Sequence, residues 1–206
     1  MFYNSEQVYQ NICILDSHDM NITPCEGDRC FVIGHHVGDR SVLTRTADLL
    51  IQGGFSYFNL FGTYAPLWKN IIRTRAEGKR PVRIEASTVD QEGMVYTLAM
   101  FAALEPQAQN FVLSDDAFFT EYLVEDLEKI FSGKTPYTPR DWQIFRSGFE
   151  FTYHGKDAVM SVGDGIVTGF LKEEKKFPMV FKAFSAPIFD GKSFDEIWDE
   201  IADQRP

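Results

Sequence analysis

Cysteine is scarce in this chain, and its spacing argues against a disulfide framework. The 206 residues include three cysteines, Cys13, Cys25 and Cys30, an odd number without a Cys-x-x-Cys pair. Proteins held together by disulfides usually carry even sets of cysteines, and they belong to oxidising compartments. We therefore expect free thiols and a cytoplasmic location.

Long apolar runs and an excess of positive charge are missing as well. No 18 uncharged apolar residues follow one another, and the start, MFYNSEQVYQ, has no basic segment before an apolar run. We therefore expect neither a membrane span nor a secretion signal. The 20 Lys and Arg are outnumbered by 30 Asp and Glu, for a net charge of −10. Nucleic acids and anionic membranes bind basic surfaces, so neither is expected as a partner.

The chain also contains no complete catalytic or dinucleotide-binding motif. Gly34 and Gly38 lie four residues apart, whereas the dinucleotide fingerprint needs three glycines spaced G-x-G-x-x-G. The nucleophile-elbow motif G-x-S-x-G is absent. A dinucleotide dehydrogenase is therefore disfavoured, and no cofactor follows from the sequence.

What the chain does contain is a strong strand-turn-helix unit between Cys30 and Gly54. An apolar run without alternation, residues 31–33, predicts a parallel strand that is covered on both faces. A turn with two glycines follows, and Asp39 or Ser41 can cap the next helix. The inward stripe of that helix is formed by Leu43, Ala47, Leu50 and Ile51, and Gly53 and Gly54 end it.

The same pattern recurs along the first two thirds of the chain. Strands are predicted at residues 57–61, 82–86 and 111–113, and helices at 65–76, from Thr88 onward and at 118–131. Thr88 and Gln91 have the spacing of a capping box, and Ser114 or Asp115 can cap the last of these helices. Since the four units recur at the length of a right-handed crossover, we expect a Rossmann-like three-layer α/β fold with a mainly parallel sheet of about four βα units.

The ends of the chain differ from this core, which we place at residues 30–133. Residues 1–29 hold either a helix over 5–15 or a short strand over 12–15, followed by a loop. After a proline-containing boundary at 133–140, residues 134–206 predict an antiparallel β-meander and a short helix opened by the capping box of Ser193 and Glu196. The predicted strands of the meander span 149–153, 158–162, 166–171 and 179–184. The meander can either extend the parallel sheet or form a separate flap. Because so few residues make a marginal core of their own, we favour the first, with the meander as part of one domain.

The candidate binding site follows from the fold. In an open parallel sheet, ligands bind outside the carboxyl ends of the strands, where turns and helix N-termini converge. The turns placed there supply small residues, hydroxyls and backbone N–H groups that can receive a phosphate or carboxylate. They comprise Gly34, His35, His36, Gly38, Asp39, Gly62, Thr63, Tyr64, Ser87, Thr88, Ser114 and Asp115. The sequence thus favours a protein that binds a small ligand, a nucleotide or another phosphorylated metabolite, with Tyr64 and Trp68 as either stacking partners or core residues.

Two alternatives stay open. Asp16, His18, His35 and His36 supply the donor types of a divalent-metal hydrolase, in which the metal activates a water molecule. The triplet Asp16-Ser17-His18 resembles the opening Asp-x-His of metal-dependent phosphoesterases, although no Gly-Asn-His or Gly-His-x-His segment follows it. Asp115 and Asp116 belong to the same set of possible metal ligands, but they also suit the cap and first turn of a helix. The other alternative is a non-catalytic domain whose acidic, aromatic-rich surface binds a basic partner, and the 15% aromatic content also favours a homo-oligomer.

Overall fold

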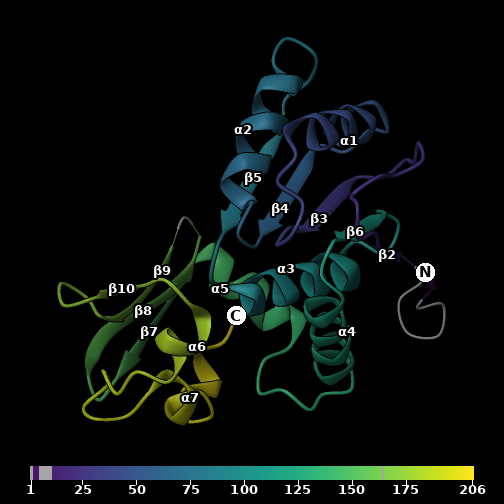
Figure 1. Cartoon of the computed structure of the whole chain (residues 1–206). Helices are drawn as coiled ribbons and strands as arrows, with labels where there is room; N and C mark the ends of the chain where they lie inside the picture. The colour runs from purple at the N-terminus through teal and green to yellow at the C-terminus, as the bar shows by residue number, and fades with distance from the viewer. Residues whose placement is uncertain (1, 5–10, 164) are drawn as a thin grey trace.

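Two separate sheets organise the chain in the computed structural model, which describes residues 2–4, 11–163 and 165–206 (Figure 1). The first sheet has six strands in the order β1-β2-β6-β3-β4-β5, and all of them are parallel except β1. Its strands are β1 (Phe2–Asn4), β2 (Ile12–Asp16), β3 (Arg29–Ile33), β4 (Tyr57–Phe61), β5 (Arg83–Ser87) and β6 (Asn110–Ser114). The second sheet is antiparallel, with strands β7 (Phe149–Tyr153), β8 (Lys156–Val162), β9 (Ile166–Phe170) and β10 (Lys175–Phe177).

The parallel sheet is wound in two directions from β3. The chain runs outward from β3 to β4 and β5 through α1 (Arg40–Gln52) and α2 (Ala65–Ala76), and α3 (Gln91–Leu104) then returns it to β6 on the other side of β3. Helices α1 and α2 lie on one face of the sheet, while α3 and α4 (Ala117–Phe131) lie on the other (Figure 1). The predicted Rossmann-like α/β architecture is confirmed, and its switch point lies between β3 and β6.

Local sequence explains the elements around this switch point. The side chain of Asp39 caps α1 by accepting hydrogen bonds from the N–H groups of Ser41 and Val42, and the predicted inward stripe of that helix is buried. Strand β4 and helix α2 have the predicted bounds, and the more polar β5 lies at the sheet edge, as its composition indicates. Residues 12–16 form a strand, β2, which pairs in parallel with β6 and adds a fifth parallel strand. The alternative of a helix over 5–15 is therefore wrong for residues 12–15, and its first part, 5–10, lies outside the described residues.

Two predicted helix caps are wrong. Helix α3 begins at Gln91 with Asp90 as its cap, because the Ser87 hydroxyl accepts from the N–H groups of Val89 and Asp90 and extends the turn past Thr88. Helix α4 is capped by Asp116 rather than by Ser114 or Asp115. The carboxylate of Asp115 instead accepts hydrogen bonds from the turn after β3.

The C-terminal region also departs from prediction. The meander is present, but its strands pair only with one another, so the expectation that they extend the parallel sheet is wrong. Residues 179–184 contain helix α6 (Val180–Phe184) instead of a strand, and β10 takes the edge position. Helix α5 (Pro139–Ser147) was not predicted, whereas the capping box of Ser193 and Glu196 does open α7 (Phe194–Ile197), before a 3-10 turn at Ala202–Gln204.

One apolar core joins the two sheets. It contains Ile12 and Val112 from the parallel sheet together with Phe149 and Met160 from the antiparallel sheet. Between them lies a cluster of aromatic rings that includes Tyr137, Trp142, Phe145, Phe184, Phe194 and Trp198. Much of the unusual aromatic content of the chain is therefore used to pack the second sheet and helices α5 to α7 against the first. Within the described ranges, no helix is both long and apolar enough to cross a membrane.

Candidate functional site

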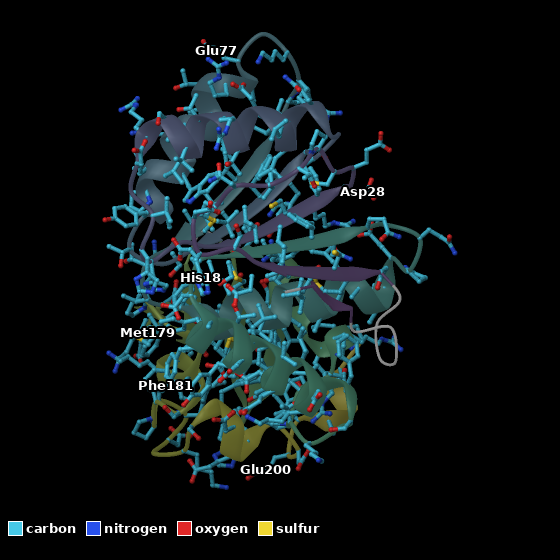
Figure 2. The ribbon with its side chains drawn as sticks, turned by 45° about the vertical axis from the view of Figure 1, so that its right-hand side comes forward. His18, Asp28, Glu77, Met179, Phe181 and Glu200 are labelled. Carbon is cyan, nitrogen blue, oxygen red and sulfur yellow. The ribbon has the colours of Figure 1, made fainter. Side chains whose placement is uncertain are left out.

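The carboxyl ends of the parallel strands form one edge of the molecule. His18, which follows β2, and Asp28, which precedes β3, mark opposite ends of the sheet in Figure 2. The turns after β3, β4 and β6 therefore lie on the side of His18. This edge holds most of the predicted site residues.

The turn after β3 is fastened to the end of β6 by Asp115. One carboxylate oxygen of this buried side chain accepts a hydrogen bond from the His35 N–H at 2.7 Å, and the other accepts from His36 and Val37 at 3.0 and 2.8 Å. The Asp115 N–H in turn donates to the Ile33 carbonyl. Three consecutive backbone N–H groups thus converge on one carboxylate, which belongs to the protein itself rather than to a ligand.

The side chains of His36 and Asp116 lie in contact beside this turn. The Nε2 atom of His36 lies 2.8 Å from a carboxylate oxygen of Asp116, and the imidazole side chain is 64% exposed whereas that of Asp116 is 11% exposed. Asp116 is itself fixed, because it caps α4 by accepting from the N–H of Phe119. A carboxylate that orients an exposed imidazole is an arrangement suited to hydrogen bonding and proton transfer. From the sequence, Asp116 is a candidate both for the metal constellation and for the start of a helix, and no pairing with His36 is predicted.

His35 is held between aromatic rings. Its imidazole stacks on Phe119, with centroids 4.5 Å apart and an interplanar angle of 9°, and meets the edge of Phe61 at 5.1 Å. Its Nδ1 lies 3.3 Å from the Thr63 hydroxyl. In the part of the chain that the structure describes, its buried Nε2 has no hydrogen-bond partner. Two of the candidate residues, His35 and Thr63, are therefore brought together, and the Nε2 atom of the ring is available for a further hydrogen bond.

The glycines and the neighbouring aromatic residues of the site serve close packing. A Cβ at Gly34 would lie 3.0 Å from Trp68 Nε1, and one at Gly38 would lie 2.5 Å from the Tyr64 ring. Gly62 has φ +111° and approaches the Gly34 carbonyl. Trp68 is fully buried, which identifies it as a core residue rather than a stacking partner for a ligand.

The remaining predicted residues mainly support the backbone. Ser87 closes the turn before α3, and the buried Ser114 hydroxyl donates to the Asp116 carbonyl. Asp39 caps α1, while Thr88 is exposed after the edge strand β5. The candidate site therefore comprises the turns at the switch point between β3 and β6, together with Thr63 from the turn after β4.

In the described part of the chain, the side chains proposed as metal ligands do not come together in the same way. Asp16 ends β2, next to β6, and one of its carboxylate oxygens is buried without a hydrogen-bond partner among the described residues. His18 is exposed in the following loop. Over the described ranges, no group of three or more His, Cys, Asp and Glu side chains has an arrangement that could hold a metal ion. Cys30 is buried, and burial raises the pKa of its thiol well above the ordinary value, which disfavours a reactive thiolate.

The structure also shows an acidic cavity that the sequence did not predict. About 350 Å³ in volume, it lies between the start of α3, helix α4 and helix α6, and it is lined in part by Asp90, Glu92, Tyr96, Asp126 and Phe181. Burial, reinforced by the negative charges of Asp90, Asp126 and Asp195, raises the pKa of Glu92 to about 7. The cavity depends on the helical form of residues 180–184, which the sequence placed in a strand.

Glu92 predicts a pH-dependent stability. A carboxyl whose pKa is higher in the folded state than in the unfolded state costs stability as the pH rises from its ordinary pKa through about 7. We expect Glu92→Gln to become progressively more stable than the wild type, with the difference growing by about 1–2 kcal/mol between pH 5 and pH 8. Urea unfolding at both pH values measures this. Glu128→Gln, which removes an exposed carboxylate from α4, is the control, and an equal pH dependence in both variants would refute the assignment.

No protein-family model, no curated protein and no solved structure matches this chain. Evidence for its function therefore comes from the geometry of the chain itself.

Proposed function

We propose that the protein binds a small polar ligand at the switch point between β3 and β6. The observation that carries this proposal is the His36–Asp116 pair, an exposed imidazole held by a nearly buried carboxylate at the position where doubly wound sheets bind ligands. Asp115 makes the turn that carries His36 rigid, so the imidazole is held in place before a ligand arrives. His35 and Thr63 offer further polar atoms on the same edge.

The identity of the ligand's polar group is constrained by charge. A phosphate cannot reach the N–H groups of residues 35–37 while the Asp115 carboxylate occupies them, so a nucleotide or phosphorylated metabolite would have to present its phosphate to His36. The carboxylates of Asp115 and Asp116 repel a phosphate at short range. Uncharged hydroxyl or amide groups meet no such penalty, and they can accept from or donate to an imidazole.

A thermal-shift comparison tests the proposal. The probes are adenosine, AMP, ribose 5-phosphate and inorganic phosphate, each with and without a chelator. A ligand at one hundred times its dissociation constant should stabilise the protein by about 2.7 kcal/mol. We expect at least one of the three organic probes to stabilise the wild type. For His36→Gln, we expect the same stabilisation to require about a tenfold higher concentration of that probe.

His154→Gln is the matched control. His154 is also an exposed histidine beside a carboxylate, Asp190, but it lies in the hairpin turn of the second sheet. An equal loss of binding in both variants, or no stabilisation by any probe, would overturn the proposal. Destabilisation by the chelator alone would support the metal alternative instead. Gly34→Val is unsuitable as a test, because its side chain would press on Trp68 in the core.

A further inference from the structure

A continuous series of aromatic rings leads from the candidate site to the surface of α4. The His36 and His35 rings lie 6.4 Å apart, His35 stacks on Phe119, and the Phe119 and Phe118 rings meet at 5.4 Å. The Phe118 ring then contacts that of Tyr122 at 4.7 Å. Helical spacing explains this last contact, because residues four apart lie on the same side of a helix.

Phe118 and Tyr122 are unusually exposed. Phe118 is 59% and Tyr122 is 47% accessible to solvent, although both rings belong to a helix whose opposite side is buried through Leu123 and Leu127. The two rings are tilted by 60° to each other, and each leaves much of its apolar surface in contact with water. Such surfaces favour an aromatic partner, which stacks on them at little entropic cost.

The surroundings of this ring pair restrict what can cover it. Further exposed positions of α4 carry the acidic residues Glu121, Glu125 and Glu128, while the exposed Lys129 is paired with Asp126. Charged residues are depleted from the centres of protein interfaces, and a stable interface needs about 800 Å² on each partner. Two rings among carboxylates fit a single planar ring better than they fit a protein surface or an anionic membrane.

We propose that Phe118 and Tyr122 form a stacking platform for a planar heterocyclic ring, and that the ligand of the switch-point site is therefore a nucleoside-like molecule. This inference rests on the proposed function. The heterocycle stacks on α4, and the hydroxyl groups of the attached sugar lie toward His36 and Thr63. An uncharged or cationic ring is favoured over an anionic ring, because carboxylates flank the platform.

Titration calorimetry with matched probes tests the stacking assignment. The probes are adenosine, AMP and ribose 5-phosphate, and the proteins are the wild type, Phe118→Ala, Tyr122→Ala and Phe181→Ala. Phe181 is 51% exposed on α6, which makes it a control for removing an exposed ring elsewhere. We expect adenosine to bind, Phe118→Ala and Tyr122→Ala each to weaken its binding about tenfold, and Phe181→Ala to leave it unchanged. Any binding of ribose 5-phosphate should be the same in all four proteins.

The outcomes separate this inference from the proposed function. If ribose 5-phosphate binds through His36 while adenosine does not bind, or binds equally to all four proteins, the platform is overturned and the proposed function stands. If no probe binds, both are overturned. Light scattering adds one more test, because a change in native mass in Phe118→Ala would show a self-association surface and would also overturn the platform.

Discussion

Arg146→Ala will lower the free energy of unfolding by about 2–3 kcal/mol, because it removes two charged hydrogen-bond donors from a half-buried carboxylate. The guanidinium of Arg146 binds both carboxylate oxygens of Glu85, at 2.6 and 3.2 Å, and its side chain is only 13% exposed. Glu85 also accepts a hydrogen bond from the Tyr57 hydroxyl at 2.8 Å. The pair thus ties α5 to the edge strand of the parallel sheet. Equilibrium urea unfolding measures the loss.

The same carboxylate supplies the matched control. Arg83 lies 2.9 Å from Glu85, but its side chain is 68% exposed. Surface pairs of this kind contribute about 0–1 kcal/mol, so Arg83→Ala should cost no more than that. Equal losses in the two variants would show that burial is not what makes the Arg146 pair strong.

The effect of Arg146 should also depend on pH. Burial alone would raise the pKa of Glu85, but the hydrogen bonds and charge of Arg146 outweigh it, so the pKa lies below its ordinary value. A carboxyl with a lowered pKa in the folded state stabilises the protein above its unfolded-state pKa, and this contribution fades as the pH falls through the folded-state value. The difference between the wild type and Arg146→Ala should therefore be largest near neutral pH and should shrink in acid.

Local sequence patterns predict the strands and helices of the parallel core well, but they fail for segments of only a few residues. Residues 57–61 and 65–76 have the predicted bounds because an apolar run and a helical stripe are each decided within a few residues. The segment 179–184 is too short for that. Val180, Ala183 and Phe184 are buried at helical spacing while Phe181 is exposed, and six mostly apolar residues interrupted by Lys182 do not distinguish this from a strand.

The sequence contains a start signal for helix α5, which the prediction of a boundary at residues 133–140 does not use. Thr138 and Asp141 form a capping box, and Pro139 occupies the first helical position, where its missing N–H costs nothing. The two prolines of residues 133–140 instead suggested a linker. Because α5 contributes Trp142 and Phe145 to the shared core, missing it also hid the packing between the two sheets.

The edge that carries the candidate site follows from the sequence, but the contacts within it do not. The turns after β3 and β6 could be assigned to one edge of a parallel sheet from the strand pattern alone. Which strands are neighbours was not readable, because the order β6-β3-β4 depends on a crossover rather than on any local pattern. Asp115 therefore looked like a helix cap, whereas it reaches across to the turn after β3.

Asp115→Ala will be the most damaging change at the candidate site, with an expected loss of about 3 kcal/mol in the free energy of unfolding. The substitution leaves the N–H groups of His35, His36 and Val37 without their acceptor, and each lost bond to a charged group costs about 1.5–3 kcal/mol if the donor stays buried. The turn is partly accessible, so water will replace some of these bonds and the loss will be smaller than their sum. Urea unfolding measures it.

Asp39→Ala separates this effect from ordinary capping. Asp39 also accepts from two backbone N–H groups, but it is exposed, so its loss should cost about 1 kcal/mol. If Asp115 holds the turn as an internal anion, then added inorganic phosphate should restore part of the stability of Asp115→Ala by binding the freed N–H groups, and it should do nothing of the kind for Asp39→Ala. Recovery in neither variant would show that the turn collapses once its carboxylate is removed. Asp115 would then hold His36 in place in two ways, by setting the shape of the turn and by supplying the negative charge that its N–H groups bind.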